Sequence, residues 1–105
     1  MKETRVEVGR AQDFAEGSLT PLTIGGREVL VICQEGRYYA VPDRCTHQRF
    51  PLHDGELLDG RIKCAHHGAT FDLETGRATL PAVKKLQIFR TEVEDDLLYV
   101  VMQEA

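Results

Sequence analysis

The N-terminal half of the chain contains one clear strand–turn–strand pattern. Residues 28–33 are expected to form a buried strand, because residues 29–33 are an apolar run of suitable length, and residues 37–41 form a second strand-like segment after a turn that contains Gly36. Gly in such a turn indicates a tight β-hairpin. The alternation at residues 5–8 predicts an earlier strand, whereas residues 11–18 are mostly small or polar and predict a short helical turn or a loop. This half is therefore expected to be mainly β-structure.

The C-terminal end repeats the hairpin pattern. Residues 86–93 largely alternate between apolar and polar positions, residues 94–96 are acidic turn residues, and residues 97–101 are again mainly apolar. No stretch carries a convincing apolar stripe at helical spacing over three turns. We expect this second hairpin to pair with the first in an antiparallel arrangement.

Residues 42–82, between the two hairpins, differ in composition from the rest of the chain. They hold three of the four prolines, two of the three cysteines and all four histidines. Loops carried by a rigid scaffold are frequent locations of functional sites. Because 105 residues are the length of one domain, we predict a single all-β domain over residues 1–105. Its expected parts are an antiparallel β-sandwich base and a loop-rich subdomain inserted at about residues 42–82.

Charge and targeting signals narrow the function classes. A net charge of −4 and a pI near 5.5 have the wrong sign for a nucleic-acid binder. We interpret the acidic excess as a solubility feature, with docking against a basic partner as the alternative. The N-terminus lacks the pattern of a signal peptide, and no apolar run is long enough to cross a membrane. We therefore expect a cytoplasmic protein with neither a membrane nor a nucleic-acid partner.

The candidate chemistry lies in two short Cys/His pairs. One residue separates Cys45 from His47, and two residues separate Cys64 from His67. Sixteen residues lie between the two pairs. Thiolate sulfur and neutral imidazole both bind soft or borderline metals. Structural zinc usually takes two cysteines from one turn, whereas each pair here offers one cysteine and one histidine. A mononuclear zinc site stays possible, but a dinuclear cluster accommodates the tight first pair more naturally.

Cys-x-His followed by Cys-x-x-His resembles the signature of the Rieske iron–sulfur family, and specifically of its ferredoxins that serve oxygenases. The likeness extends to turn residues from about position 29 to position 100; these are Leu52, Gly55, Gly68, Phe71, Asp72, Thr75, Gly76 and Pro81. In that family both cysteines bind one iron of a 2Fe–2S cluster and both histidines bind the other. The resemblance therefore implies one 2Fe–2S cluster on Cys45, His47, Cys64 and His67.

The resemblance also implies a function. We expect an electron-transport ferredoxin, a component of an oxidoreductase system and not itself an enzyme. It would carry single electrons from a flavin-dependent reductase to a terminal oxygenase of the ring-hydroxylating type. Two alternatives are open: a protein like the small subunit of nitrite reductase, and a structural zinc-binding interaction domain.

Departures from the high-potential Rieske proteins predict a low reduction potential. Those proteins place hydroxyl donors after the second ligand histidine, where this chain has Ala69 and Phe71. They also join the two loops by a disulfide, where this chain has Phe50 and His66. We therefore predict a potential of roughly −150 mV and no disulfide, with His66 packing towards Phe50.

Three further residues have plain structural interpretations. His53 is expected on the surface, and Cys33 is expected in the core as a small apolar side chain. Pro81 is expected to cover the cluster, with the end of a strand as the alternative interpretation. The cations nearest to the motif along the chain are balanced by nearby acids, so no patch of one sign is expected there.

Overall fold

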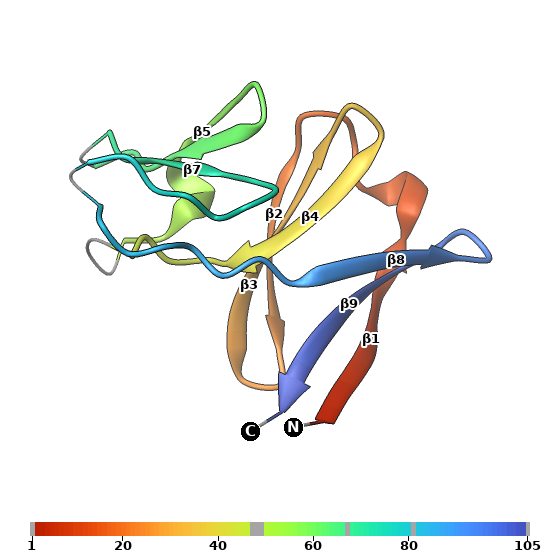
Figure 1. Ribbon diagram of the computed structural model, residues 1–105. Coiled ribbons are helices and arrows are strands. Elements are labelled where there is room, and N and C mark those ends of the chain that lie inside the picture. Colours follow the sequence, from red (N-terminus) through yellow and green to blue (C-terminus); the bar gives the residue numbers. More distant parts are fainter. Residues whose placement is uncertain (1, 47–49, 67, 81, 105) are drawn as a thin grey trace.

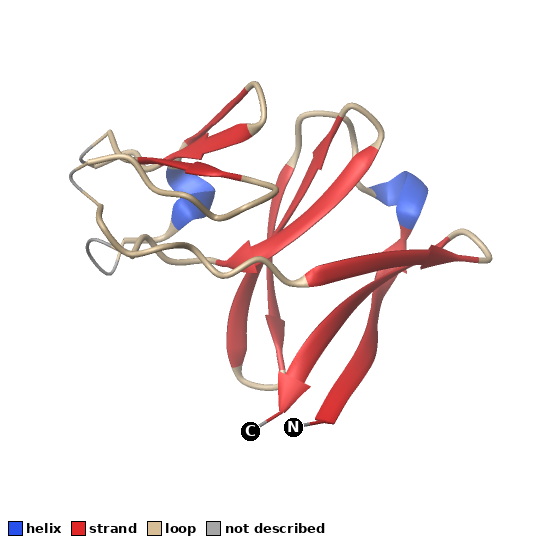
Figure 2. Ribbon diagram, in the orientation of Figure 1, coloured by secondary structure: helices blue, strands red, loops and turns tan. Residues whose placement is uncertain are grey.

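The computed structural model describes residues 2–46, 50–66, 68–80 and 82–104 of the chain. Three antiparallel sheets of three strands each form the described structure, and two short 3-10 helices accompany them (Figure 1, Figure 2). This architecture confirms the all-β prediction. Neither helix of the described residues is long and apolar enough to cross a membrane.

The first sheet joins the two ends of the chain. Its order is β1 (Lys2–Arg10), β9 (Leu97–Glu104) and β8 (Arg90–Glu94). The register of β1 on β9 shifts between Glu7 and Gly9, which marks a β-bulge. Directly after β1 follows the 3-10 helix η1 (Ala11–Asp13), in the region expected to be a helical turn or a loop.

The second sheet contains the first predicted hairpin. Its order is β2 (Leu19–Ile24), β3 (Arg27–Gln34) and β4 (Arg37–Pro42). Strand β2 was missing from the sequence prediction, because Pro21 and the surrounding threonines weaken its apolar pattern. Pro21 is tolerated there because β2 is an edge strand.

The two predicted hairpins are not neighbouring strands of one sheet, although they meet. Strand β9 pairs with β8 on one side and with β1 on the other. The contacts of this sheet with the second sheet include a bridge between Ala40 and Phe89, a hydrogen bond from the Thr91 hydroxyl to the carbonyl of Tyr38 at 2.8 Å, and a shared apolar core. The backbone N–H of Phe89 donates to the carbonyl of Ala40 at 2.8 Å in this bridge. The alternation at residues 86–93 predicted a strand but not its partner, and the strand begins only at Arg90.

The third sheet lies within the insert, residues 42–82. It consists of β5 (Glu56–Leu58), β6 (Arg61–Lys63) and β7 (Thr70–Asp72), and η2 (Leu52–Asp54) precedes it. Figure 1 shows this sheet to one side of the two larger sheets, with the segment after β7 returning across it to β8. The insert thus contains a small sheet of short strands, while most of its described residues lie in loops and turns, as its composition predicts.

Strand β3 explains how the two parts are held together. Val29, Val31 and Cys33 are buried in the core of the two-sheet base, whereas Leu30 and Ile32 are buried in the core of the insert. Successive side chains of a strand point to opposite faces, so a strand buried on both faces needs a continuous apolar run. This is the physical reason for the uninterrupted apolar pattern of residues 29–33.

Candidate metal centre

Two loops of the insert are closed in the same way. The backbone N–H of Cys45 donates to the carbonyl of Phe50 at 2.9 Å, and that of Cys64 donates to the carbonyl of Ala69 at 2.7 Å. In each loop the backbone N–H of a cysteine is therefore hydrogen-bonded to the carbonyl of the residue five positions later. The first cysteine follows β4 and the second follows β6, so each loop begins at the end of a strand.

Both cysteines face the interior. The exposed fraction is 3% for Cys45 and 0% for Cys64, and both belong to the apolar cluster that contains Leu52, Ile62 and Phe71. The structure thus brings these two predicted ligands, nineteen positions apart in the sequence, into one core. Apolar surroundings keep water away from a metal–thiolate bond and lower the local dielectric constant.

The two predicted histidine ligands, His47 and His67, lie outside the described residues, as does Pro81. By sequence, His47 falls inside the loop closed by Cys45 and Phe50, and His67 falls inside the loop closed by Cys64 and Ala69. Each loop therefore carries one candidate thiolate and one candidate imidazole. This donor set fits a mixed-ligand 2Fe–2S cluster.

The two loops contact each other through aromatic rings. The centroid of the Phe50 ring lies 3.8 Å from that of the His66 ring, and the ring planes differ by 21°. The prediction that His66 packs towards Phe50 is confirmed. Phe50 and His66 occupy the two positions at which the high-potential Rieske proteins are expected to carry their loop-joining disulfide. The cysteines of this chain, Cys33, Cys45 and Cys64, are all buried thiols.

A third segment, residues 82–86, lies near the first loop. The hydroxyl of Thr46 donates to the backbone carbonyl of Lys84 at 2.7 Å, and the N–H of Leu86 donates to the carbonyl of Gly76 at 2.8 Å. Gly76 has φ +81°, and a Cβ atom there would collide with the backbone of Leu86. Close approach of this segment therefore requires glycine at position 76.

The base of the first loop is held by a buried carboxylate. Asp43, which is 5% exposed, accepts the backbone N–H of His53 at 2.8 Å on Oδ1 and contacts Nδ1 of the same residue at 2.5 Å through Oδ2. The hydrogen bond to Asp43 raises the pKa of His53, and the charges of Asp43, Asp54 and Glu28 add to the effect. His53 is 37% exposed, so the surface prediction captured its position but not its partner.

A side-chain amide connects the base to the third sheet. Gln34, at the end of β3, donates through Nε2 to the carbonyl of Leu58 at 2.7 Å and accepts the N–H of Gly60 at 2.8 Å on Oε1. Leu58 and Gly60 belong to the β5–β6 turn, whose second strand leads directly to Cys64. Gln34 therefore fixes the strand that presents the second loop, a role that the sequence did not indicate.

A family model described as the Rieske [2Fe-2S] domain matches residues 4–90 of the chain. The chain belongs to the Rieske family. The resemblance inferred from the Cys/His motif is thus confirmed. The match covers both cysteine loops, the whole of the second and third sheets, the segment that follows β7 and part of the first sheet.

Relatives of this Rieske domain include ferredoxin components of oxygenase systems. The alkene monooxygenase system ferredoxin component of Xanthobacter autotrophicus is 36% identical over 85% of the chain and 74% of its own length. The ferredoxin component of the naphthalene 1,2-dioxygenase/salicylate 5-hydroxylase systems of Ralstonia sp. is 27% identical over 98% and 100%. Human apoptosis-inducing factor 3 is 31% identical over 89% of the chain, which spans only 16% of that protein.

Solved Rieske structures share the fold closely. The ferredoxin of carbazole 1,9a-dioxygenase from Nocardioides aromaticivorans has a TM-score of 0.86 at 28% identity, covering 92% of this chain and 96% of that one. A chain from the complex of reduced oxygenase and oxidized ferredoxin in carbazole 1,9a-dioxygenase has a TM-score of 0.85 at 30% identity, covering 91% of both. The predicted β-sandwich base with a cluster-binding insert is therefore the fold of known Rieske ferredoxins.

Proposed function

We propose that this Rieske protein is a one-electron carrier whose 2Fe–2S cluster is bound by Cys45, His47, Cys64 and His67. The observation that carries the proposal is the equivalence of the two loops, each of which begins with a buried cysteine and is closed by the same backbone hydrogen bond. The family match supports the cluster type. The spacing of the four residues supports their assignment as ligands.

A bound cluster supplies a centre that accepts and returns one electron, at a higher potential than an all-cysteine cluster because two ligands are neutral imidazoles. The chain itself supplies the surroundings. Cys45 and Cys64 are kept out of water by the apolar core of the insert. The Phe50–His66 stack holds the two loops at a fixed separation, which limits the reorganisation that accompanies a change of charge.

We further propose that the donor is a flavin-dependent reductase and the acceptor is a terminal oxygenase in the cytoplasm. The ferredoxin components of the alkene monooxygenase and naphthalene dioxygenase systems are relatives of this chain, and the carbazole dioxygenase ferredoxin is known in complex with its oxygenase. In this role the chain carries electrons for a reaction that another protein catalyses.

The test is anaerobic preparation of the protein with iron and sulfide supplied, followed by metal analysis and electron paramagnetic resonance (EPR) of the dithionite-reduced form. We expect two irons and two acid-labile sulfides per chain. The average g-value should be lower than that of an all-thiolate cluster. A single bound zinc atom in place of iron and sulfide would overturn the proposal in favour of the structural zinc alternative.

Matched variants test the ligands. Cys64→Ala should abolish the EPR signal, whereas Cys33→Ala, which changes a buried cysteine in the base core, should retain it. His67→Ala should likewise abolish the signal, whereas the adjacent His66→Ala should retain it. A signal that survives His67→Ala but not His66→Ala would show that the histidine assignment is wrong.

A further inference from the structure

The acidic excess of the chain lies outside its cluster-binding part. Residues 42–85 contain seven Lys and Arg against six Asp and Glu, whereas the rest of the chain contains six against eleven. The rest of the chain therefore carries a net charge of −5, whereas residues 42–85 carry +1. This positive balance depends on Lys84 and Lys85, which directly follow the insert, residues 42–82. The field near these two lysines therefore differs from that of the acidic molecule as a whole.

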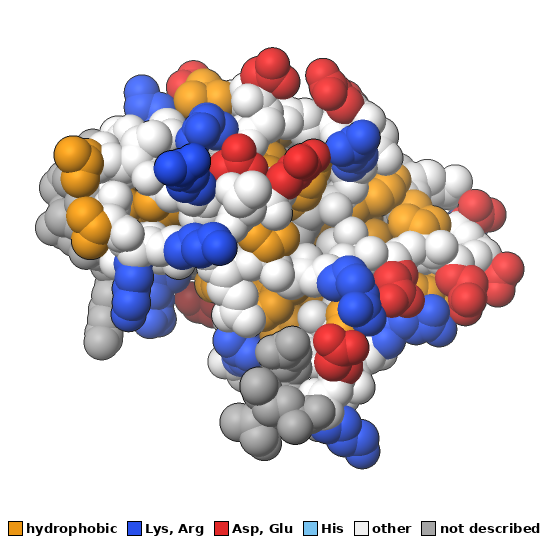
Figure 3. All heavy atoms as spheres, viewed as in Figure 1, with side chains coloured by type: hydrophobic (Ala, Val, Ile, Leu, Met, Phe, Trp, Pro, Cys, Tyr) orange, Lys and Arg blue, Asp and Glu red, His pale blue; other side chains and the backbone are white. Residues whose placement is uncertain are grey.

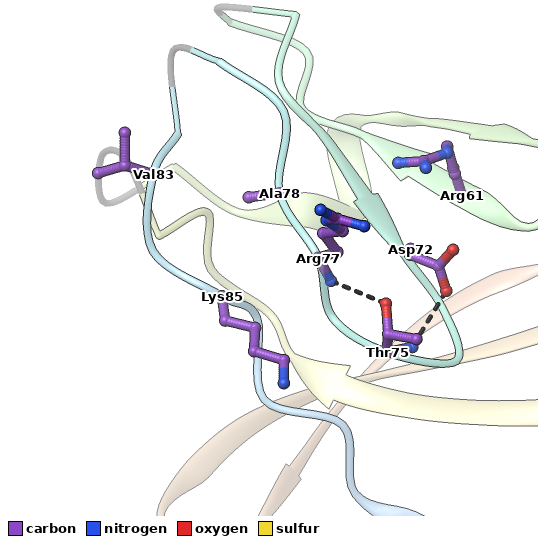
Figure 4. A pocket seen from close by; sticks show the side chains of 7 residues that line it. All are labelled: Arg61, Asp72, Thr75, Arg77, Ala78, Val83 and Lys85. Carbon is purple, nitrogen blue, oxygen red and sulfur yellow. Dashed lines mark hydrogen bonds between the residues drawn. The ribbon is translucent and has the colours of Figure 1, made fainter.

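A hollow of about 610 Å³ on the insert collects three of these cations. Arg61 comes from β6, whereas Arg77 and Lys85 come from the segment between β7 and β8, and all three line the hollow together with Val83 (Figure 4). We call this surface, defined by Arg61, Arg77, Val83 and Lys85, the cationic flank. Blue side chains gather over the same part of the molecule in Figure 3.

The cations of the flank are not paired with acids. Within the described part of the chain, no carboxylate lies within 4.0 Å of the charged nitrogens of Arg61, Arg77 or Lys85. On the base, by contrast, Arg5 and Arg90 each contact two glutamates. Arg61 lies opposite Asp72 on β7. Backbone hydrogen bonds lower the pKa of that carboxylate and the charge of Arg61 adds to the effect, so Arg61 is partly compensated. Arg77 and Lys85 have no such partner among the described residues, so the flank keeps unpaired positive charge at these two side chains.

One acid, Asp72, also lines the hollow, but it serves its own turn. Its Oδ1 accepts the backbone N–H groups of Glu74 at 2.8 Å and Thr75 at 3.0 Å. The Thr75 hydroxyl in turn accepts the N–H of Arg77 at 3.2 Å (Figure 4). Asp72 thus shapes the loop that carries Arg77, and the lining of the hollow keeps a net positive charge.

Exposed apolar side chains adjoin these cations. Val83 is 84% exposed and Leu80 is 77% exposed, and both lie in the segment that carries Lys85. Scattered apolar residues on a surface are ordinary, but two in one short segment beside arginines match the composition of protein interfaces, which are rich in apolar side chains and arginine.

The flank and the loops that carry the proposed ligands are joined by short segments. Arg61 begins β6, the strand that leads to Cys64. Lys85 follows Lys84, whose carbonyl accepts the hydroxyl of Thr46 in the first loop. A protein that covers the flank is therefore brought next to the cluster loops, as electron transfer requires.

We propose that the cationic flank is a docking surface for an acidic patch, with an apolar centre, on the protein that accepts the electron. This proposal rests on the proposed function and adds the chemistry of the partner. Carboxylates on the acceptor would complement the cations and steer the approach of the acceptor. Val83 would pack against the apolar centre of the patch and exclude water there. A small anion alone would use the charges but would leave the exposed apolar side chains uncovered.

The test uses the reduced holoprotein and two protein acceptors of opposite charge, the acidic cytochrome b5 and the basic cytochrome c. Electron transfer is followed by stopped-flow absorbance at several ionic strengths. Because salt screens attraction, transfer to the acidic acceptor should slow as salt rises, despite the net negative charge of the donor. Transfer to the acidic acceptor that becomes faster with salt would overturn the proposal.

The variant Arg77→Glu/Lys85→Glu changes two exposed residues of the flank. We expect it to lower the rate to the acidic acceptor at low salt by about tenfold and to raise the rate to the basic one. The control Lys2→Glu/Arg10→Glu makes the same change of net charge on β1, in the base. Equal effects of the two variants would show that only net charge matters and would overturn the docking surface.

Absorbance and EPR of every variant separate the two proposals. Absence of the cluster from the wild-type protein would contradict the proposed function. A normal cluster with no flank-specific effect would contradict the docking surface alone. If Arg77→Glu/Lys85→Glu loses its cluster, Arg77→Ala/Lys85→Ala replaces it. This variant should also transfer electrons to the acidic acceptor more slowly than the wild type at low salt. An unchanged rate would contradict the docking surface.

Discussion

Phe50 and His66 stack face to face and connect the two loops that carry the cysteines. Their ring centroids are 3.8 Å apart. Phe50 also accepts the N–H of Cys45 through its backbone carbonyl, so the stacked ring belongs to the residue that closes the first loop. The stacked pair connects the two loops without a covalent bond, so reductants do not cleave this connection.

A double-mutant cycle should measure this connection. Phe50→Ala and His66→Ala should each destabilise the holoprotein, and their combined effect should be smaller than the sum by about 0.5–1.5 kcal/mol, the usual worth of an aromatic pair. Urea unfolding followed by cluster absorbance gives the free energies. His66→Phe, which keeps an aromatic ring, should retain most of the stability. Strict additivity of the two alanine variants would refute the coupling.

The sequence predicted an element correctly where its pattern of apolar and polar residues is compatible with only one kind of structure. The apolar run at residues 29–33 predicted a buried strand, and its continuity reflects burial on both faces. The pairing of the second hairpin could not be read in the same way, because alternation fixes which face of a strand is buried but not which strand lies beside it. The partner, β1, is the strand farthest away in sequence.

The amide of Gln34 bridges the base and the β5–β6 turn, and its removal should loosen the insert. Gln34→Ala leaves the part-buried carbonyl of Leu58 and N–H of Gly60 without these bonds, so we expect a loss of about 1–3 kcal/mol in the free energy of unfolding. Gln12→Ala, an exposed glutamine in η1, is the control and should change it by less than about 0.5 kcal/mol. Equal stabilities of the two variants would contradict a bridging role.

Interaction between Asp43 and His53 should make stability depend on pH. Because the folded state raises the pKa of His53, its contribution is fully present below the unfolded value of about 6.5 and is lost as pH rises through the folded pKa. We therefore expect the stability difference between wild type and His53→Gln to be larger at about pH 6 than at about pH 9.

Urea unfolding of both proteins at the two pH values measures this difference, and subtraction cancels the other titrating groups that the two proteins share. Asp54→Asn serves as the comparison, because Asp54 contributes only its charge to the pKa of His53. It should reduce the pH dependence less than removal of the histidine does. A stability gap that widens towards high pH would mean that the sign is wrong.

The cationic flank shows what sequence reasoning missed at the site. Counting charges near the motif gave a balance, since Arg61 has acidic neighbours along the chain such as Asp59. Folding brings Arg77 and Lys85 beside Arg61 from a segment that returns across the insert. A surface assembled from distant segments leaves no local pattern. The cysteine loops could be predicted because the two members of each proposed ligand pair lie within three positions of each other in the sequence.

Ala69 offers a direct test of what sets the potential. It is fully buried in the core that contains both cysteines, and its methyl group cannot donate a hydrogen bond. The wild-type potential is expected at roughly −150 mV. Ala69→Ser should raise it, because a hydroxyl donor stabilises the more negative, reduced cluster. A bond stronger by about 1–1.5 kcal/mol in the reduced state corresponds to roughly 40–65 mV.

Protein-film voltammetry measures the shift, and Ala40→Ser provides the matched control. Ala40 is also fully buried but lies in the core of the base, so its hydroxyl should cost stability without changing the potential. The comparison isolates the local bond from any general effect of a buried polar group. If Ala69→Ser keeps its cluster and has the same potential as Ala40→Ser, the missing hydroxyl does not lower the potential. The predicted low value would then have to come from the charge or the solvent exposure of the cluster.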